Sequence, residues 1–175
     1  FMLVNLLMPL LTNEARITVV SSSAHKVFSY HDGIQFGNFS GSNKYNPHKA
    51  YGHSKLANLL FSNELAKRLE GSDQTANAVH PGVIRTNLLR NYNPLIKFGA
   101  VVADKLLFKN IHQGAATQIY ASTHPDLKYI SGKYFSNCNI EAPSRHGADQ
   151  AMAKQLWEFS ENIVNQISQG NYWED

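Results

Sequence analysis

Cysteine is nearly absent from this sequence, and long runs of like charge or of apolar residues are absent too. The single cysteine, Cys138, excludes a disulfide within the chain and favours a reducing compartment, here the cytoplasm. No Cys/His spacing resembles a zinc site, so we expect no metal. The net charge of +3 comes from scattered residues, which argues against a nucleic-acid partner. The apolar start, residues 1–11, is too short to span a bilayer, and we expect no membrane segment in this chain.

The rest of the composition is that of an ordinary globular protein. Hydrophobic residues make up 43% and charged residues 17% of the 175 positions, which indicates one domain over 1–175. Apolar periodicity and turn residues predict an opening helix, a strand over 15–23, a Ser-, Gly- and Asn-rich loop over 24–46, a helix over 48–70, a strand over 75–82, a helix over 111–123, a strand over 132–137 and a helix over 147–168. This alternation indicates an α/β fold, part of a Rossmann-like doubly wound parallel sheet with about three strands.

Three strands are few for a parallel sheet, which is normally covered on both faces and has five or six. The first strand is therefore expected to keep an unpaired edge, on the side where an earlier strand belongs. Residues 87–110 carry many large apolar side chains between turn residues. They are either short helices that form a flap over a site or plain core.

A tyrosine and a lysine lie one helical turn apart near the start of the predicted helix over 48–70. The chain has three Tyr-x-x-x-Lys pairs, but the pair at 45 and 49 encloses a proline and the pair at 129 and 133 a glycine. Only Tyr51 and Lys55 begin an apolar series with three- and four-residue steps, which is Leu56, Leu59, Leu60, Leu65 and Leu69. The helical context therefore singles out this pair.

An ammonium group about one turn from a phenol favours the phenolate, and such a tyrosine can exchange a proton with an alcohol or a ketone. Ser22, at the carboxyl end of the preceding strand, could hold the substrate oxygen. Pro81 and Gly82 end the next strand and let the backbone turn close to a ligand, and Thr86 adds a hydroxyl. Read alone, the serines and the Pro-Gly pair are equally well explained as turn formers; together they meet at one edge of the predicted sheet.

The segments "TVVSSS", "YGHSK" and "HPGVIRT", in this order, resemble the short-chain dehydrogenase/reductase family. The stretches "HSKLANLLFSNELAKRL", "NAVHPGVIRTNL", "QGAATQIYAS" and "GKYFSNC" are most similar to its retinol-dehydrogenase-like branch. The resemblance implies an NAD- or NADP-dependent oxidoreductase that transfers a hydride between the nicotinamide and an alcohol or ketone, with a lipophilic retinoid or steroid as the expected substrate. It also implies a homodimer formed through the helix that carries Tyr51.

The same resemblance implies roles for individual residues. Tyr51 would be the catalytic acid/base, Lys55 would favour its phenolate and bind the nicotinamide ribose, and Ser22 would hold the substrate oxygen. Ser22 is preferred to Ser21 because the family uses the second serine of its strand-end pair. The nicotinamide side of the cofactor would be held by Tyr51, Lys55, Pro81, Gly82, Val83 and Thr86.

The resemblance begins partway into the family's domain. The glycine-rich phosphate-binding turn, the Asn-Ala-Gly strand and the catalytic asparagine of the family have no counterpart in these 175 residues. We therefore expect the chain alone to be inactive and a protein that also holds those parts to be catalytic. The alternative is an inactive fragment or a non-enzymatic interaction protein that keeps a partial fold.

Other reactive residues are interpreted as structural. The "GHS" at 52–54 has Leu56 where a nucleophile elbow needs a second glycine, which disfavours a hydrolase. His25, His80 and His112 have no readable carboxylate partner and are expected to be packing or surface residues. Cys138 follows a strand and is expected to be buried.

Overall fold

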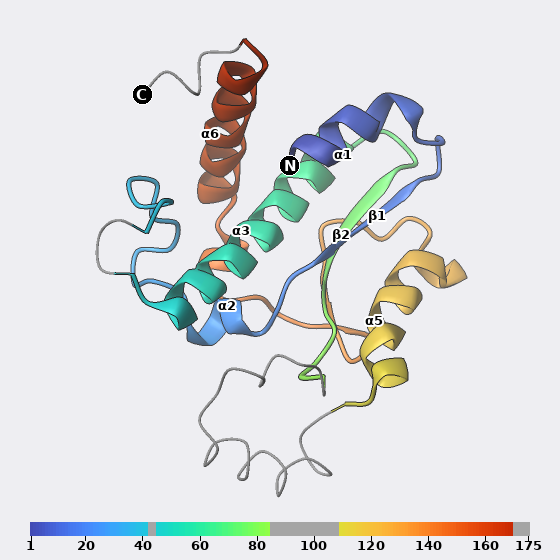
Figure 1. Ribbon diagram of the computed structural model, residues 1–175. Helices are drawn as coiled ribbons and strands as arrows, with labels where there is room; N and C mark the ends of the chain where they lie inside the picture. Colours follow the sequence, from blue (N-terminus) through green and yellow to red (C-terminus); the bar gives the residue numbers. More distant parts are fainter. Residues whose placement is uncertain (42–44, 85–108, 170–175) are drawn as a thin grey trace, which may run out of the picture.

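The computed structural model, shown in Figure 1, describes residues 1–41, 45–84 and 109–169. Its centre is a sheet with the strand order β1-β2-β3-β4. The parallel part consists of β1 (Arg16–Val20), β2 (Thr75–His80) and β3 (Tyr134–Ser136), and the short β4 (Asn139–Ile140) runs antiparallel to β3. The predicted α/β fold and its three parallel strands are confirmed. The added strand, β4, has only two residues and therefore no periodicity that could have predicted it.

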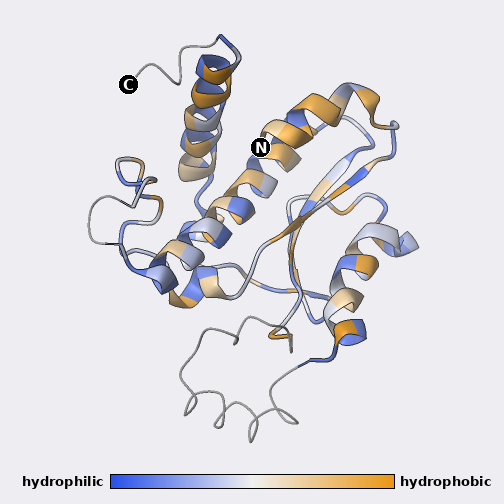
Figure 2. Ribbon diagram, in the orientation of Figure 1, coloured by the Kyte–Doolittle hydropathy of each residue, from blue (hydrophilic) through white to orange (hydrophobic). Residues whose placement is uncertain are grey.

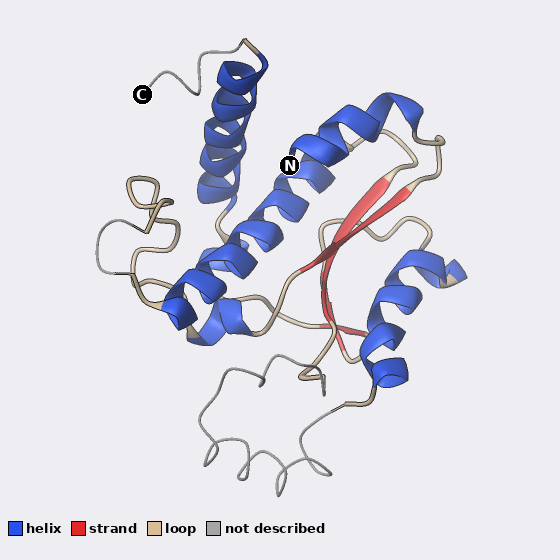
Figure 3. Ribbon diagram, in the orientation of Figure 1, coloured by secondary structure: helices blue, strands red, loops and turns tan. Residues whose placement is uncertain are grey.

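Helices cover both faces of this sheet, as a doubly wound fold requires. The long α3 (Pro47–Arg68) lies against β1 and β2 on one face, and α5 (Ile111–Thr123) lies against the same strands on the other (Figures 1 and 3). The last helix, α6 (Gln150–Ser168), packs on α3. The other helical elements in the described ranges are α1 (Met2–Leu7), α2 (Ala24–Val27) and the short turns η1 (Met8–Leu10), η3 (Pro125–Leu127) and η4 (His146–Ala148).

The start of α3 is fixed by its own sequence. The side chain of Asn46 accepts hydrogen bonds from the N–H groups of His48 and Lys49, and Pro47 occupies the first turn, where a missing N–H costs nothing. The predicted leucine series is buried along the helix, and Leu56, Leu59 and Leu60 are fully so. Because Tyr45 precedes this helix and residues 129–133 are not helical, only Tyr51 and Lys55 form a Tyr-x-x-x-Lys pair within one helix.

Small residues in β2 allow helices to approach both of its faces. Ala78 packs with Leu59 of α3 and with Tyr134. Val79 points to the other face and forms a cluster with Ala121 of α5 and with Leu127 and Phe135. A strand buried on both sides is what a parallel sheet under two helical layers demands.

Some expectations need correction. The loop predicted over 24–46 contains the helix α2, because four residues are too few to show a helical pattern. Cys138 is not buried but partly exposed, since it occupies the tight turn between β3 and β4 with a φ of 58°. The flap predicted over 87–110 lies almost wholly outside the described residues.

The first helix leaves much of its apolar surface uncovered. Figure 2 shows hydrophobic residues along α1, and the most exposed large ones in this region are Leu3, Leu6 and Leu10. In the described part of the chain, β1 has a strand on one side only, as the sequence predicts. Within the same residues no helix combines the length and the apolar character needed to cross a membrane.

Candidate active site

The two serines that follow β1 have different environments. Ser21 continues the ladder by donating its N–H to the carbonyl oxygen of Val79 (2.8 Å). Its hydroxyl donates to the main-chain oxygen of Lys55 at 2.7 Å, and the residue is only 1% exposed. Ser21 therefore joins the strand to α3 and is not available to a substrate.

Ser22 has a hydroxyl group that remains able to donate. Its oxygen accepts a hydrogen bond from the N–H of Ala24 at 3.2 Å, and no acceptor for the hydroxyl proton is found among the described residues. Its carbonyl oxygen accepts two bonds from His25, one from the backbone N–H (3.1 Å) and one from the ring Nδ1 (2.5 Å). The partly buried Ser22 is thus fixed at its backbone, while its O–H group can still bind an oxygen atom of a ligand.

Tyr51 and Lys55 lie side by side in the first half of α3. The ammonium nitrogen of Lys55 is 5.6 Å from the centroid of the Tyr51 ring, and Tyr51 is 43% exposed. A side-chain bond from Asn58 to the carbonyl oxygen of Val20 (3.0 Å) holds the helix against the end of β1. Together with the bond from Ser21 to Lys55, it keeps the tyrosine–lysine pair beside the strand end that carries Ser22.

Gly52 explains how the pair comes so close to the segment after β1. A Cβ atom at this position would lie 2.6 Å from the carbonyl carbon of Phe28, which ends α2. Only a glycine allows α3 to approach this backbone. The sequence did show the glycine, inside the "GHS" stretch, but not the backbone that it faces.

The turn after β2 also depends on a glycine. Gly82 has a φ of 93°, which is strained for residues with a side chain. Above it lies the side chain of Lys109, whose ammonium nitrogen is 3.5 Å from the carbonyl oxygen of Pro81 and whose backbone N–H donates to Val83 (2.8 Å). Val83 itself is well exposed. Thr86, the last residue predicted to bind the cofactor, lies outside the described residues.

Two imidazoles near the strand ends are held in the neutral form. Burial lowers the pKa of His25. Burial also lowers the pKa of His80 at the end of β2, and the ammonium of Lys109 lowers it further. Beside them Lys26 and Glu141 form an ion pair, and the hydrogen bond from Lys26 lowers the pKa of Glu141. Among the described residues, Lys55 and Lys109 add positive charge near this edge.

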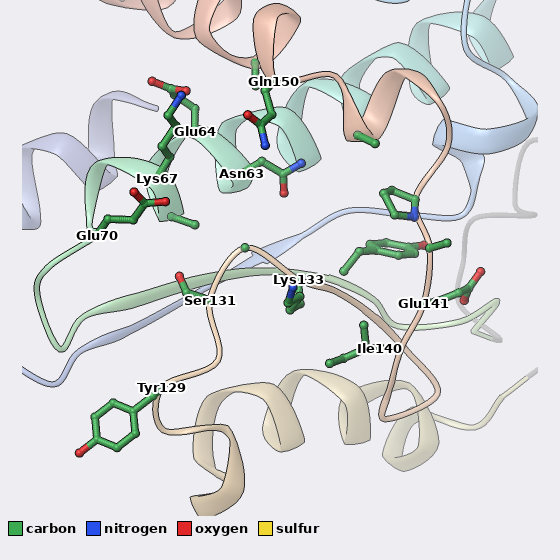
Figure 4. Close-up of a pocket in the computed structure, with 17 residues that line it drawn as sticks. Asn63, Glu64, Lys67, Glu70, Tyr129, Ser131, Lys133, Ile140, Glu141 and Gln150 are labelled. Carbon is green, nitrogen blue, oxygen red and sulfur yellow. The ribbon is translucent and has the colours of Figure 1, made fainter.

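A cavity of about 840 Å³ lies elsewhere, between α3 and the segments around β3 and β4. Figure 4 shows Glu64, Lys67 and Glu70 at one end of it and Ile140 and Glu141 toward the other. Of the predicted site residues that the structure describes, none lines this cavity. The predicted active site is therefore distinct from it.

Comparison with curated proteins identifies similar sequences along almost the whole chain. The short-chain dehydrogenase TIC 32 B, chloroplastic, of Brassica napus is 43% identical over 179 residues, which is 95% of this chain and 54% of that protein. Retinol dehydrogenase 14 of Homo sapiens is 41% identical over 168 residues, 94% of this chain and 49% of that protein. The WW domain-containing oxidoreductase of Gallus gallus is 37% identical over 173 residues, 95% of this chain and 41% of that protein.

A solved structure is also similar to this chain. The crystal structure of an uncharacterised protein from Mycobacterium paratuberculosis matches with a TM-score of 0.68 and 34% identity, covering 93% of this chain and 54% of that one. Over almost its whole length the chain is similar to proteins of the short-chain dehydrogenase/reductase family. No protein-family model matches it, and the chain spans about half the length of the curated relatives it matches. The resemblance to the retinol-dehydrogenase-like branch is confirmed by the relatives' names.

Short-chain dehydrogenases/reductases use a nicotinamide cofactor, and the described residues fit one half of it. The ammonium of Lys55 beside a partly exposed phenol is a donor for ribose hydroxyls. In the turn after β2, Val83 is well exposed, whereas the side chain of Lys109 occupies the space beside Gly82. These residues suit the nicotinamide and its ribose, and none of them distinguishes NAD from NADP.

Proposed function

We propose that this chain carries the catalytic residues of an NAD- or NADP-dependent oxidoreductase that interconverts an alcohol and a ketone. The observation that carries the proposal is the position of Lys55, with its ammonium 5.6 Å from the ring centroid of Tyr51. That pair is fixed to the end of β1, where Ser22 has a hydroxyl proton to donate. A proton donor, a cation and a second hydroxyl on adjacent elements can bind and protonate the oxygen of a carbonyl group while its carbon receives a hydride.

The residues would act as follows in the reducing direction. Ser22 donates a hydrogen bond to the carbonyl oxygen and holds it near Tyr51. As the carbonyl carbon receives a hydride, the oxygen gains negative charge and takes the phenolic proton of Tyr51, which leaves an alcohol and a phenolate. Lys55 stabilises that phenolate by its charge. The bound cofactor supplies the hydride in this direction and accepts it in the other.

The cofactor-binding part of the proposal uses residues of two elements. Lys55 would hold the nicotinamide ribose from α3, next to Tyr51. Pro81, Gly82 and Val83 would present backbone groups to the nicotinamide from the turn after β2. Thr86 would add its hydroxyl. The exposure of Val83 and the positive φ of Gly82 support this assignment.

Replacement of the tyrosine tests the function. The variant Tyr51→Phe in the full polypeptide that carries this chain should lose turnover and keep its affinity for NADH or NADPH, because the ring remains and only the hydroxyl group is removed. The matched control is Tyr129→Phe, since Tyr129 also precedes a lysine by four residues but lies outside any helix. Unchanged turnover in Tyr51→Phe would refute the acid/base role.

Three further properties belong to the proposal. A lipophilic substrate is supported by the relative named retinol dehydrogenase 14. A homodimer is supported by an apolar groove of about 430 Å³ between α1, α3 and α6. Light scattering would test the homodimer, which has twice the mass of a single chain. A cytoplasmic location is supported only by the single cysteine, Cys138, and microscopy of the tagged protein would test it.

A second candidate is an inactive interaction protein. The apolar side chains that α1 exposes favour it, because uncovered leucines are suited to contact with another protein. Titration of the 175-residue chain with NADH and NADPH separates the two candidates. Saturable binding would support the oxidoreductase and contradict the interaction protein.

A further inference from the structure

His25 is fully buried although it lies one residue from the surface cation Lys26. Its ring packs edge-on against Tyr134, with 5.0 Å between the centroids. Both ring nitrogens have partners: Nδ1 lies 2.5 Å from the carbonyl oxygen of Ser22, and Nε2 accepts the backbone N–H of Ser144 at 3.1 Å. Both polar atoms of this buried ring are therefore satisfied by backbone groups of two separate segments.

These two contacts define the protonation of the ring. A carbonyl oxygen can only accept, so Nδ1 must carry a proton and donate it to Ser22. A backbone N–H can only donate, so Nε2 must present its lone pair to Ser144. His25 is therefore a neutral imidazole with its proton on Nδ1. Its ring links the serine turn after β1 to a loop 119 residues further along the chain.

The contacts of His25 fix the backbone of Ser22, the residue that is proposed to bind the substrate oxygen. Two N–H groups of His25 converge on the carbonyl oxygen of Ser22, and the N–H of Ala24 reaches the Ser22 hydroxyl oxygen at 3.2 Å. The hydroxyl direction thus depends on a backbone that the imidazole fixes. Resting on the proposed function, we propose that His25 is a positioning residue that sets the backbone of Ser22, and through it the hydroxyl that receives the substrate oxygen.

Burial favours the neutral form of the ring, while the groups around it act in both directions: Lys26 lowers the pKa of His25, and Glu141 and the hydrogen bond to Ser22 raise it. Lys26 comes from the same helix, Glu141 from the segment after β4, Tyr134 from β3, and His80 from the end of β2. Lys26 and Glu141 neutralise each other in their ion pair. Burial is the main cause that lowers the pKa of His25. The link between Ser22 and Ser144 should consequently be intact at neutral pH.

A mutant cycle tests whether His25 acts through Ser22. In the full polypeptide that carries this chain, His25→Leu removes both contacts, and we expect kcat to fall roughly 10- to 100-fold. His25→Asn keeps a donor where Nδ1 lies and should recover much of this loss. In a Ser22→Ala background, His25→Leu should cause little further loss in kcat, because the hydroxyl that it positions is already gone. An additive loss, or an Asn variant no better than Leu, would overturn the proposal.

The cycle also separates this proposal from the proposed function. If Ser22→Ala alone leaves turnover unchanged, the catalytic role of Ser22 is wrong. If Ser22→Ala is impaired but His25→Leu is not, the positioning role alone is wrong.

The protonation of His25 can also be measured directly in the unmutated 175-residue chain. This experiment does not depend on catalytic activity or on the folding of a variant. The ¹⁵N chemical shifts of the His25 ring at pH 7 should show a protonated Nδ1 and an unprotonated Nε2. A ring protonated on Nε2, alone or together with Nδ1, would contradict the proposal.

Discussion

The hydroxyl of Ser21 donates a hydrogen bond to the main-chain oxygen of Lys55 at 2.7 Å, and this bond joins the end of β1 to the helix that bears the predicted catalytic pair. The hydroxyl groups of the two adjacent serines therefore make different contacts. Ser21 fixes the position of α3, and Ser22 is left with a hydroxyl that can meet a substrate. The preference for the second serine, which rested on resemblance alone, now has physical support.

Replacing each serine by alanine should separate stability from turnover. Ser21→Ala should lower the free energy of unfolding by about 1 kcal/mol, because a buried hydrogen bond is lost. Ser22→Ala should change the stability little but reduce kcat by about 100-fold or more, as for other donors to a developing oxyanion. Urea unfolding and steady-state kinetics on both variants check this. The reverse pattern would show that the assignment of the two serines is wrong.

Gly52→Ala should destabilise the protein even though alanine favours helices. The added Cβ would lie 2.6 Å from the carbonyl carbon of Phe28 and 2.7 Å from its oxygen, so α2 and α3 would have to move apart. We expect a loss of about 1–3 kcal/mol in the free energy of unfolding. Thermal or urea unfolding measures it.

Gly37→Ala is the matched control, because a Cβ at Gly37 would meet nothing within 4 Å. It should leave the stability nearly unchanged. Equal effects of the two substitutions would mean that the close approach at Gly52 is not real.

The sequence predicted the elements with long patterns and missed those whose meaning lies in tertiary contacts. The helix expected over 48–70 is α3 (Pro47–Arg68), because its leucine spacing reflects one buried face and Asn46 and Pro47 mark its start. The two-residue β4 and the four-residue α2 were not predicted, since neither is long enough for a periodic signal.

In the candidate site, too, some residues could be predicted from sequence patterns and others only from tertiary contacts. Tyr51 and Lys55 could be found because a helix converts their spacing into proximity. The sequence predicts only a packing or surface role for His25, because its partners are backbone atoms, the carbonyl of Ser22 and the N–H of Ser144, which no side-chain pattern reveals. Lys109 was missed for a similar reason, since it contacts the turn at Gly82 across a long stretch of sequence.

Gly82→Ala should distort the turn that is proposed to face the nicotinamide. With a φ of 93°, an alanine here is strained, and its Cβ would lie 2.5 Å from the Cδ atom of Lys109. We expect the free energy of unfolding to fall by about 1–3 kcal/mol and the affinity for NADH or NADPH to weaken. Repeating the substitution in a Lys109→Ala background removes the collision and leaves the backbone strain. If Gly82→Ala no longer lowers the free energy of unfolding in that background, the positive φ is not a cause of the loss.

Acid should weaken the fold through buried histidines. His25 and His53 both accept backbone N–H bonds through Nε2, from Ser144 at 3.1 Å and from Gln35 at 3.0 Å. Burial lowers the pKa of both below the usual 6.5. The unfolded chain then binds more protons than the folded chain, so their contribution to stability is complete above pH 6.5 and is lost as the pH falls through their lowered pKa values.

The free energy of unfolding, measured by urea titration between pH 7.5 and pH 5, should therefore decrease with acidification. His53→Gln should reduce this slope, because a glutamine can accept the N–H of Gln35 without titrating in this range. His112→Gln is the control, since His112 is exposed and should leave the slope unchanged. A stability independent of pH over this range would mean that the fold does not lower the pKa of either imidazole.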